Sequence, residues 1–139
     1  MIEFHFESEF VLNDTTDYSH WINRIIESEG FELGEIVYIF CKDDYLLKLN
    51  QKHLDHDTFT DIITFDYSDG QLISGDVFIS TERVAENANT FKVDFEEELL
   101  RVMCHGILHL MGYRDKTTRE QEIMRRKEEE KMKMFHVEQ

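Results

Sequence analysis

The sequence lacks the features of several protein classes. It contains no proline, only six glycines and no linker, repeat or low-complexity block. Its two cysteines, Cys41 and Cys104, are too few for a disulfide framework, so we expect reduced thiols in a cytoplasmic protein. No apolar run reaches the roughly 18 residues of a membrane span. The N-terminus lacks the basic and apolar regions of a signal peptide.

Basic side chains are also scarce. Fifteen lysines and arginines stand against 30 acidic residues, and the resulting net charge of −15 penalises nucleic-acid binding. Seven of the basic residues follow residue 115, where a helix would place several of them on one face. These are Lys116, Arg119, Arg125, Arg126, Lys127, Lys131 and Lys133. The alternative is an ordinary solvated helix in which they are interleaved with Glu128–Glu130.

Length and composition favour one globular domain over residues 1–139, because 41% of the side chains are hydrophobic and 12% are aromatic. Strands and helices do not strictly alternate, which predicts an α+β fold with a four-stranded mixed sheet and about five helices. The expected strands are Ile2–Phe6, Ile36–Phe40, Ile62–Tyr67 and Asp76–Ser80. Helices are expected at Asp17–Ser28, Asp43–Lys52 and Thr81–Asn89, followed by a long apolar helix and a final basic helix.

The most informative segment is residues 104–115. His105 and His109 lie four residues apart in an apolar run, so a helix would project both imidazoles from one face. Gly112 can end that helix, and Asp115 can then return an oxygen ligand to the same point. This pattern predicts an open, zincin-like metal site on a long helix. The alternative is two core histidines, each with its own hydrogen-bonding partner.

These residues resemble the YbeY family of bacterial single-strand-specific endoribonucleases and rRNA maturation factors. The run from His105 to Tyr113 is similar to the family's histidine signature, His-Gly-x-Leu-His-Leu-x-Gly-Tyr. Upstream, Thr60–Phe65 is similar to its Thr-Asp strand and Gly75–Ser80 to its Gly-Asp strand. The resemblance extends from about Ile36 to Asp115. It implies the same α+β fold, a bound metal and cleavage of single-stranded RNA.

Three positions depart from familiar patterns. The family usually closes its motif with Asp-His, whereas this chain has Arg114 and Asp115, so the third ligand becomes a carboxylate. An arginine that the family carries before the Thr-Asp strand is replaced by Leu54. Gly106 follows the first histidine, where a zinc peptidase would carry a glutamate as its general base.

We therefore expect one divalent cation held by His105, His109 and Asp115. Zinc fits two imidazoles and an open position, with manganese or nickel as alternatives because a carboxylate is a harder ligand. A nearby cation is also needed for phosphodiester cleavage, and we hypothesise that Arg114 supplies it in place of the missing arginine. The alternative is a surface arginine paired with a carboxylate.

The general base is not evident from the motif. Asp61 and Asp76 are candidates through the resemblance, and the alternative is that they are structural carboxylates bonded to backbone amides. Gly106 is expected to permit close approach of another backbone.

The leading interpretation is a metal-dependent endoribonuclease of the cytoplasm, acting in rRNA maturation and ribosome quality control. The resemblance implies single-stranded rRNA precursors as substrates and ribosomal small-subunit proteins as partners, with no role for DNA or membranes. Two alternatives remain open: a zinc peptidase, and a non-catalytic ribosome-assembly factor whose metal is structural.

Overall fold

A mixed four-stranded sheet forms the base of the structure, a computed structural model that describes residues 1–53 and 60–137. The strands lie in the order β1-β2-β4-β3. The first three in this order run parallel, and β3 is antiparallel to β4. Their bounds are Ile2–Phe6 for β1, Glu32–Cys41 for β2, Ile62–Asp66 for β3 and Leu72–Ser80 for β4. The predicted mixed sheet is confirmed.

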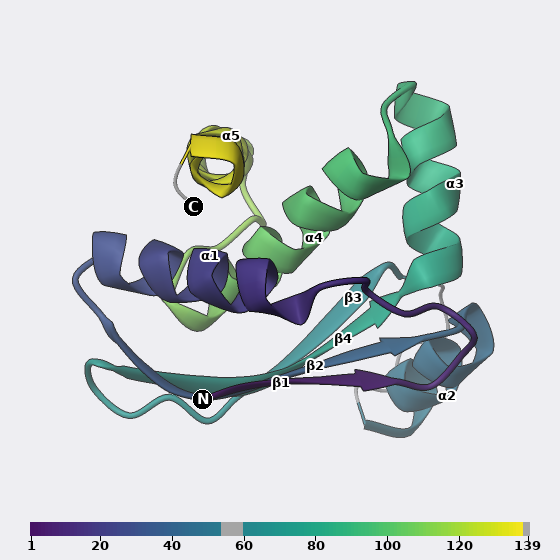
Figure 1. The fold of residues 1–139 in the computed structure, drawn as a ribbon, viewed down its shortest axis with the longest axis horizontal. Coiled ribbons are helices and arrows are strands. Elements are labelled where there is room, and N and C mark those ends of the chain that lie inside the picture. The colour runs from purple at the N-terminus through teal and green to yellow at the C-terminus, as the bar shows by residue number, and fades with distance from the viewer. Residues whose placement is uncertain (54–59, 138–139) are drawn as a thin grey trace.

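Among the residues that the structure describes, five helices accompany this sheet, as predicted for an α+β fold. They are α1 (Thr15–Ser28), α2 (Asp43–His53), α3 (Thr81–Phe91), α4 (Phe95–Leu110) and α5 (Thr118–Val137). Figure 1 shows α1 and α4 on one face of the sheet, α5 stacked on them away from the strands, and α2 at the opposite side. Within residues 1–53 and 60–137, no helix has the length and apolar character needed to cross a membrane.

Two strands begin earlier than expected. Strand β2 starts at Glu32 rather than Ile36, and β4 starts at Leu72 rather than Asp76. The two added segments pair with each other, Glu32 with Leu72, before a register shift restores regular pairing at Ile36. Backbone pairing between the two added segments extends these strands beyond the residues predicted from the local pattern.

Helix α4 packs tightly on the sheet at Gly106. A Cβ at this position would lie 2.8 Å from Val77 Cγ1 and 3.0 Å from Ile62 Cδ1. The close approach expected at Gly106 is therefore present, but side chains of β3 and β4 make it rather than a backbone. Ten residues of the helix are buried, including Cys104. This contact holds the histidine-bearing helix against the sheet.

Glu29 joins three segments that are far apart in the sequence. Its carboxylate accepts hydrogen bonds from Tyr113 Oη at 2.6 Å and Lys127 Nζ at 2.9 Å. Lys131 Nζ lies 2.7 Å from the same carboxylate and is almost fully buried. Trp21 Nε1 also donates to the Lys131 carbonyl at 2.7 Å. These bonds tie α5 and the loop before it to the end of α1, so α5 is not simply a solvated helix.

The Glu29→Gln variant tests this cluster. Burial alone raises the pKa of Glu29, but hydrogen bonds from its three donors outweigh it and lower the pKa from 4.5 to about 2. Such a carboxylate stabilises the fold above its unfolded-state pKa, and the contribution is lost as the pH falls from about 4.5 towards 2. At neutral pH we expect Glu29→Gln to lower the free energy of unfolding by up to roughly 3 kcal/mol.

Urea unfolding at a series of pH values measures this effect. The difference between wild type and Glu29→Gln should shrink steadily below the unfolded-state pKa, because the wild-type carboxyl then becomes protonated. Equal stability of the two proteins at neutral pH would contradict the assignment.

Candidate metal centre

Helix α4 presents His105 and His109 on one face. The two rings lie edge to face with centroids 4.5 Å apart, and both side chains are partly buried. The helix ends at Leu110, and Gly112 follows with a φ of 101°, a left-handed conformation that suits glycine. The predicted helix, its two histidines and its glycine stop are confirmed.

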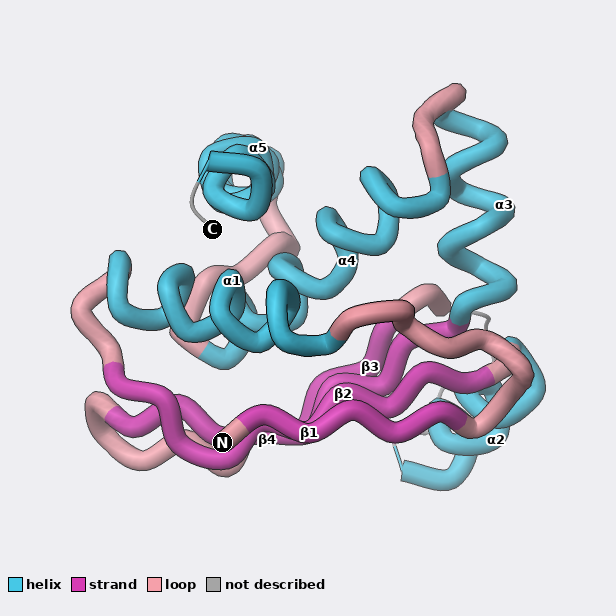
Figure 2. Tube along the Cα trace, viewed as in Figure 1, coloured by secondary structure: helices cyan, strands magenta, loops and turns pink. Residues whose placement is uncertain are grey.

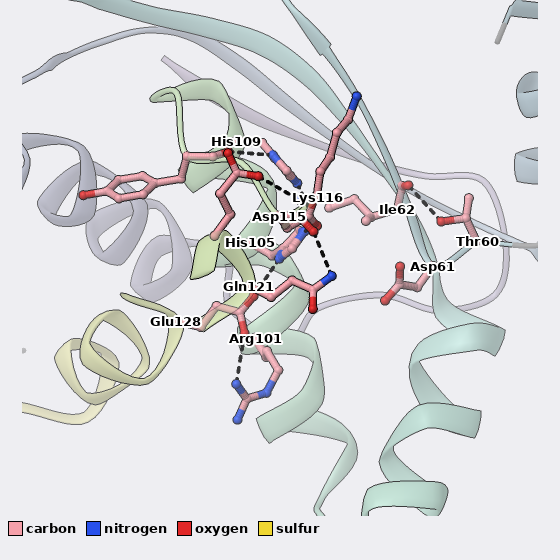
Figure 3. Close-up of polar contacts among 12 residues, drawn as sticks. Thr60, Asp61, Ile62, Arg101, His105, His109, Asp115, Lys116, Gln121 and Glu128 are labelled. Atoms are coloured by element: carbon pink, nitrogen blue, oxygen red, sulfur yellow. Dashed lines mark hydrogen bonds and ion pairs between the residues drawn. The ribbon is translucent and has the colours of Figure 1, made fainter. Parts of the chain in front are cut away.

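The loop after Gly112 brings Asp115 back to the histidines. Asp115 Oδ2 lies 3.3 Å from His105 Nε2 and 3.4 Å from His109 Nε2. One ligand atom from each of these three residues lies within 4.8 Å of the other two. Figure 2 shows this loop between α4 and α5, and Figure 3 shows the three side chains pointing toward one another. The predicted convergence of the three side chains is present.

The remaining imidazole nitrogens have fixed partners. His105 Nδ1 lies 2.6 Å from Glu128 Oε2, and His109 Nδ1 lies 2.9 Å from the Tyr113 carbonyl oxygen. Each partner is an acceptor, so each Nδ1 donates to it, and the two Nε2 atoms, which lie beside Asp115 Oδ2, are the ring positions available to bind a cation. The alternative interpretation was that each histidine has its own hydrogen-bonding partner. Such partners are present for Nδ1 of each ring, but they do not explain why the two Nε2 atoms converge on Asp115.

Glu128 contacts the site, although the sequence pattern did not identify it as a site residue. It lies on α5 with 6% of its surface exposed, and it accepts a hydrogen bond from Arg101 Nη1 at 3.0 Å. The sequence pattern had grouped it with solvated glutamates. Arg101 precedes His105 by four residues, and this spacing alone predicts that the two side chains share one face of the helix. Nothing in the sequence indicated Glu128, because the docking of α5 alone brings it to His105.

The pKa values of the two imidazoles are shifted in opposite directions by their surroundings. Burial lowers the pKa of His105, but the hydrogen bond and charge of Glu128, together with Asp115, outweigh burial and raise it. Burial and the neighbouring His105 lower the pKa of His109, against the opposing charge of Asp115. Carboxylates on two sides of the pair therefore favour positive charge at the point where the ligand atoms meet.

The donor set fits a divalent metal ion. Two imidazole nitrogens and one carboxylate oxygen converge, and both rings are held by hydrogen bonds at their far nitrogens. Three protein ligands leave a position open, which is the arrangement of catalytic rather than structural zinc sites. His105 and Asp115 line a pocket of about 290 Å³ shared with Asp61, Asn87 and the start of β3. A substrate can reach the cluster through this pocket.

The two candidate bases lie in different places. Asp61 lines the pocket, and burial raises the pKa of its carboxyl group. Asp76 precedes Val77, whose side chain meets α4, so alternation along the strand directs Asp76 to the opposite face of the sheet. There Tyr67 Oη contacts it at 3.4 Å. The structure therefore favours Asp61 over Asp76.

Two other sequence-predicted positions lie away from the cluster. Arg114 is exposed, and within the described residues it makes no hydrogen bond or ion pair. Leu54, where the family carries an arginine, lies outside the described residues.

Glu128→Gln should weaken metal binding by about 10- to 100-fold, because the charge that orients His105 is lost while the size of the side chain is kept. Glu129→Gln is the matched control, since Glu129 is the next residue, is exposed and carries the same charge. Competition with a chromogenic chelator measures both affinities. Equal affinities for the two variants would contradict a role for Glu128 in positioning His105.

Comparison with known proteins places this geometry in a family. The family model described as endoribonuclease YbeY matches residues 3–136. The endoribonuclease YbeY of Christiangramia forsetii is 59% identical over 99% of this chain and 96% of its own length. That of Flavobacterium psychrophilum is 55% identical over 100% of this chain and 99% of its own length. The solution structure of TM1509 from Thermotoga maritima superposes with a TM-score of 0.72 at 26% identity, covering 97% and 89% of the two chains. The chain belongs to the endoribonuclease YbeY family.

Proposed function

We propose that this protein is a metal-dependent endoribonuclease that cleaves single-stranded RNA and acts in rRNA maturation and ribosome quality control. The observation that carries this proposal is the convergence of His105 Nε2, His109 Nε2 and Asp115 Oδ2 beside an open pocket that His105 and Asp115 line. Family membership supports RNA as the substrate class. Single-stranded rRNA precursors and ribosomal small-subunit proteins are the proposed partners.

The three converging residues would hold the metal, which we propose to be zinc. A divalent cation supplies Lewis-acid polarisation of a phosphoryl oxygen and lowers the pKa of water. The chain itself orients the ligands: Glu128 holds His105, and the Tyr113 carbonyl holds His109. An aspartate ligand in place of the usual histidine adds one negative charge, which favours retention of a dication.

Asp61 is the proposed proton acceptor. Its carboxyl group lines the same pocket as His105 and Asp115, and Asn87 Nδ2 lies 3.5 Å from its Oδ2. Burial raises the pKa of Asp61, against the opposing charge of His105, and a higher pKa makes a carboxylate a stronger base. Gly106 occupies the position where a zinc peptidase would have its base, which disfavours peptide hydrolysis.

Removal of a ligand tests the proposed activity. We expect His109→Ala and Asp115→Ala to lose the metal and the cleavage of a single-stranded RNA, because two ligands cannot keep a catalytic cation in place. His20→Ala, which removes an exposed histidine of α1, should retain both. Elemental analysis and gel assays with RNA and peptide substrates side by side make the measurement.

Two results would reject the proposed function, and a third would revise the ligand set. Peptide cleavage without RNA cleavage by the metal-loaded protein would indicate a peptidase. A His109→Ala protein that lacks metal yet restores precursor rRNA processing in cells would indicate an assembly factor. Full metal content in Asp115→Ala would remove Asp115 from the ligand set.

We propose separately that Arg114 contacts the reacting phosphate in place of the arginine replaced by Leu54. It adjoins Asp115, is exposed, and makes no hydrogen bond or ion pair among the described residues, although its charge helps to lower the pKa of Glu120. Arg114→Ala should reduce RNA cleavage by about tenfold or more with unchanged metal content, because a charge-assisted hydrogen bond is lost. Arg114→Lys should restore only part of the rate, since lysine lacks the bidentate fork. Unchanged cleavage by Arg114→Ala ends this assignment.

A further inference from the structure

A second hollow adjoins the pocket of the candidate metal centre. The pocket of about 290 Å³ that contains His105 and Asp115 shares part of its wall with a neighbouring hollow of about 230 Å³. Four residues line both: Phe91, Glu98, Arg101 and Arg125. The two hollows therefore form one groove that leads away from the metal ligands between α3, α4 and α5.

Phe91 places an aromatic ring at this groove without burying it. The residue ends α3, and 59% of its surface is exposed. Within the described residues its ring stacks on no other aromatic side chain. A flat apolar face that remains open to solvent beside a reactive site suits a nucleobase, because every base has a π-face that can stack on it.

Arg125 supplies a positive charge that no hydrogen bond or ion pair engages among the described residues. It lies on the face of α5 that meets the site, three residues before Glu128 and four after Gln121, whose Nε2 donates to the Asp115 carbonyl at 3.1 Å. Among the described residues, Arg125 is exposed and makes no hydrogen bond or ion pair. Arg101 differs, because Glu128 already binds its guanidinium.

The acidic groups of the groove decide where a phosphate can lie. Glu98 and Glu128 are almost fully buried in its floor, and Arg101 lies between them, 3.9 Å from Glu98 and 3.0 Å from Glu128. Their negative charges repel a phosphate from the floor. The exposed guanidinium of Arg125 is therefore the place in this groove where a phosphate gains a charge-assisted hydrogen bond.

We infer that the groove is a nucleotide-binding subsite for single-stranded RNA, in which a base stacks on Phe91 and an adjacent phosphate binds Arg125. The inference rests on the proposed nuclease function, for which it names the contacts that hold the strand outside the reacting position. Bases of a duplex are stacked inside their helix and cannot reach Phe91, so the subsite selects unpaired RNA.

Equilibrium binding tests the subsite separately from cleavage. The probe is a fluorescent single-stranded 2′-O-methyl oligonucleotide of about ten nucleotides, long enough to span a typical single-strand site. Its anisotropy is followed with the metal-loaded protein, and a gel confirms that the probe stays intact. We expect Phe91→Ala and Phe91→Leu to bind about tenfold more weakly, and Phe91→Trp to bind at least as tightly as wild type.

The salt dependence tests Arg125. Arg125→Ala should weaken binding and reduce the slope of log K against log salt by about 0.7, the value for one lost phosphate contact on a single strand. Arg125→Lys should keep the slope. Arg126→Ala is the matched control, because Arg126 is the neighbouring exposed arginine of α5 and lines neither hollow, so its slope should equal that of wild type.

The outcomes separate this inference from the proposed function. Wild-type affinity in both Phe91→Ala and Arg125→Ala overturns the subsite, even if wild type cleaves RNA. A duplex that binds with the same dependence on Phe91 also overturns it. The expected losses in a protein that never cleaves RNA uphold the subsite and reject the nuclease. A wild-type protein that binds no probe rejects the subsite.

Discussion

The docking of α5 against α1 is the constraint on which the site depends. Glu29 binds Lys127 and Lys131 of α5, and it also binds Tyr113 of the loop that carries Asp115. The carbonyl of the same Tyr113 holds His109. One partly buried carboxylate at the end of α1 thus positions the loop and the last helix together, and through them Asp115 and Glu128.

The excess of acidic residues in this chain affects the charge of this site directly. Asp115 and Glu128 face opposite nitrogens of His105, so the ligand cluster attracts a cation. The same carboxylates repel the phosphates of RNA. A phosphate must therefore lie near a basic side chain that no carboxylate already neutralises. Two of the six lysines and arginines of α5 do not serve that purpose directly. Lys127 and Lys131 form ion pairs with Glu29, whereas Arg125 is exposed beside the pocket.

Local patterns predicted much of the fold because they depend on neighbours in the sequence. Asp14 and Ser80 cap their helices through the amides of Thr16 and Arg83. The extensions of β2 and β4 escaped prediction, because their pairing joins residues about 40 positions apart and leaves no mark in either segment alone. Asp76, a candidate base by resemblance, alternates with Val77 along β4, and the packing of α4 on the Val77 side leaves Asp76 on the opposite face of the sheet.

The sequence by itself determined the convergence of the three candidate ligands. His105 and His109 share a helix face through a four-residue spacing, and Gly112 and Asp115 follow within one short loop, so short-range geometry suffices. Only the tertiary structure decided what surrounds them. Glu128, Arg125 and Phe91 reach the site through the packing of α3, α4 and α5, and contacts between helices carry no periodicity that a single chain segment reveals.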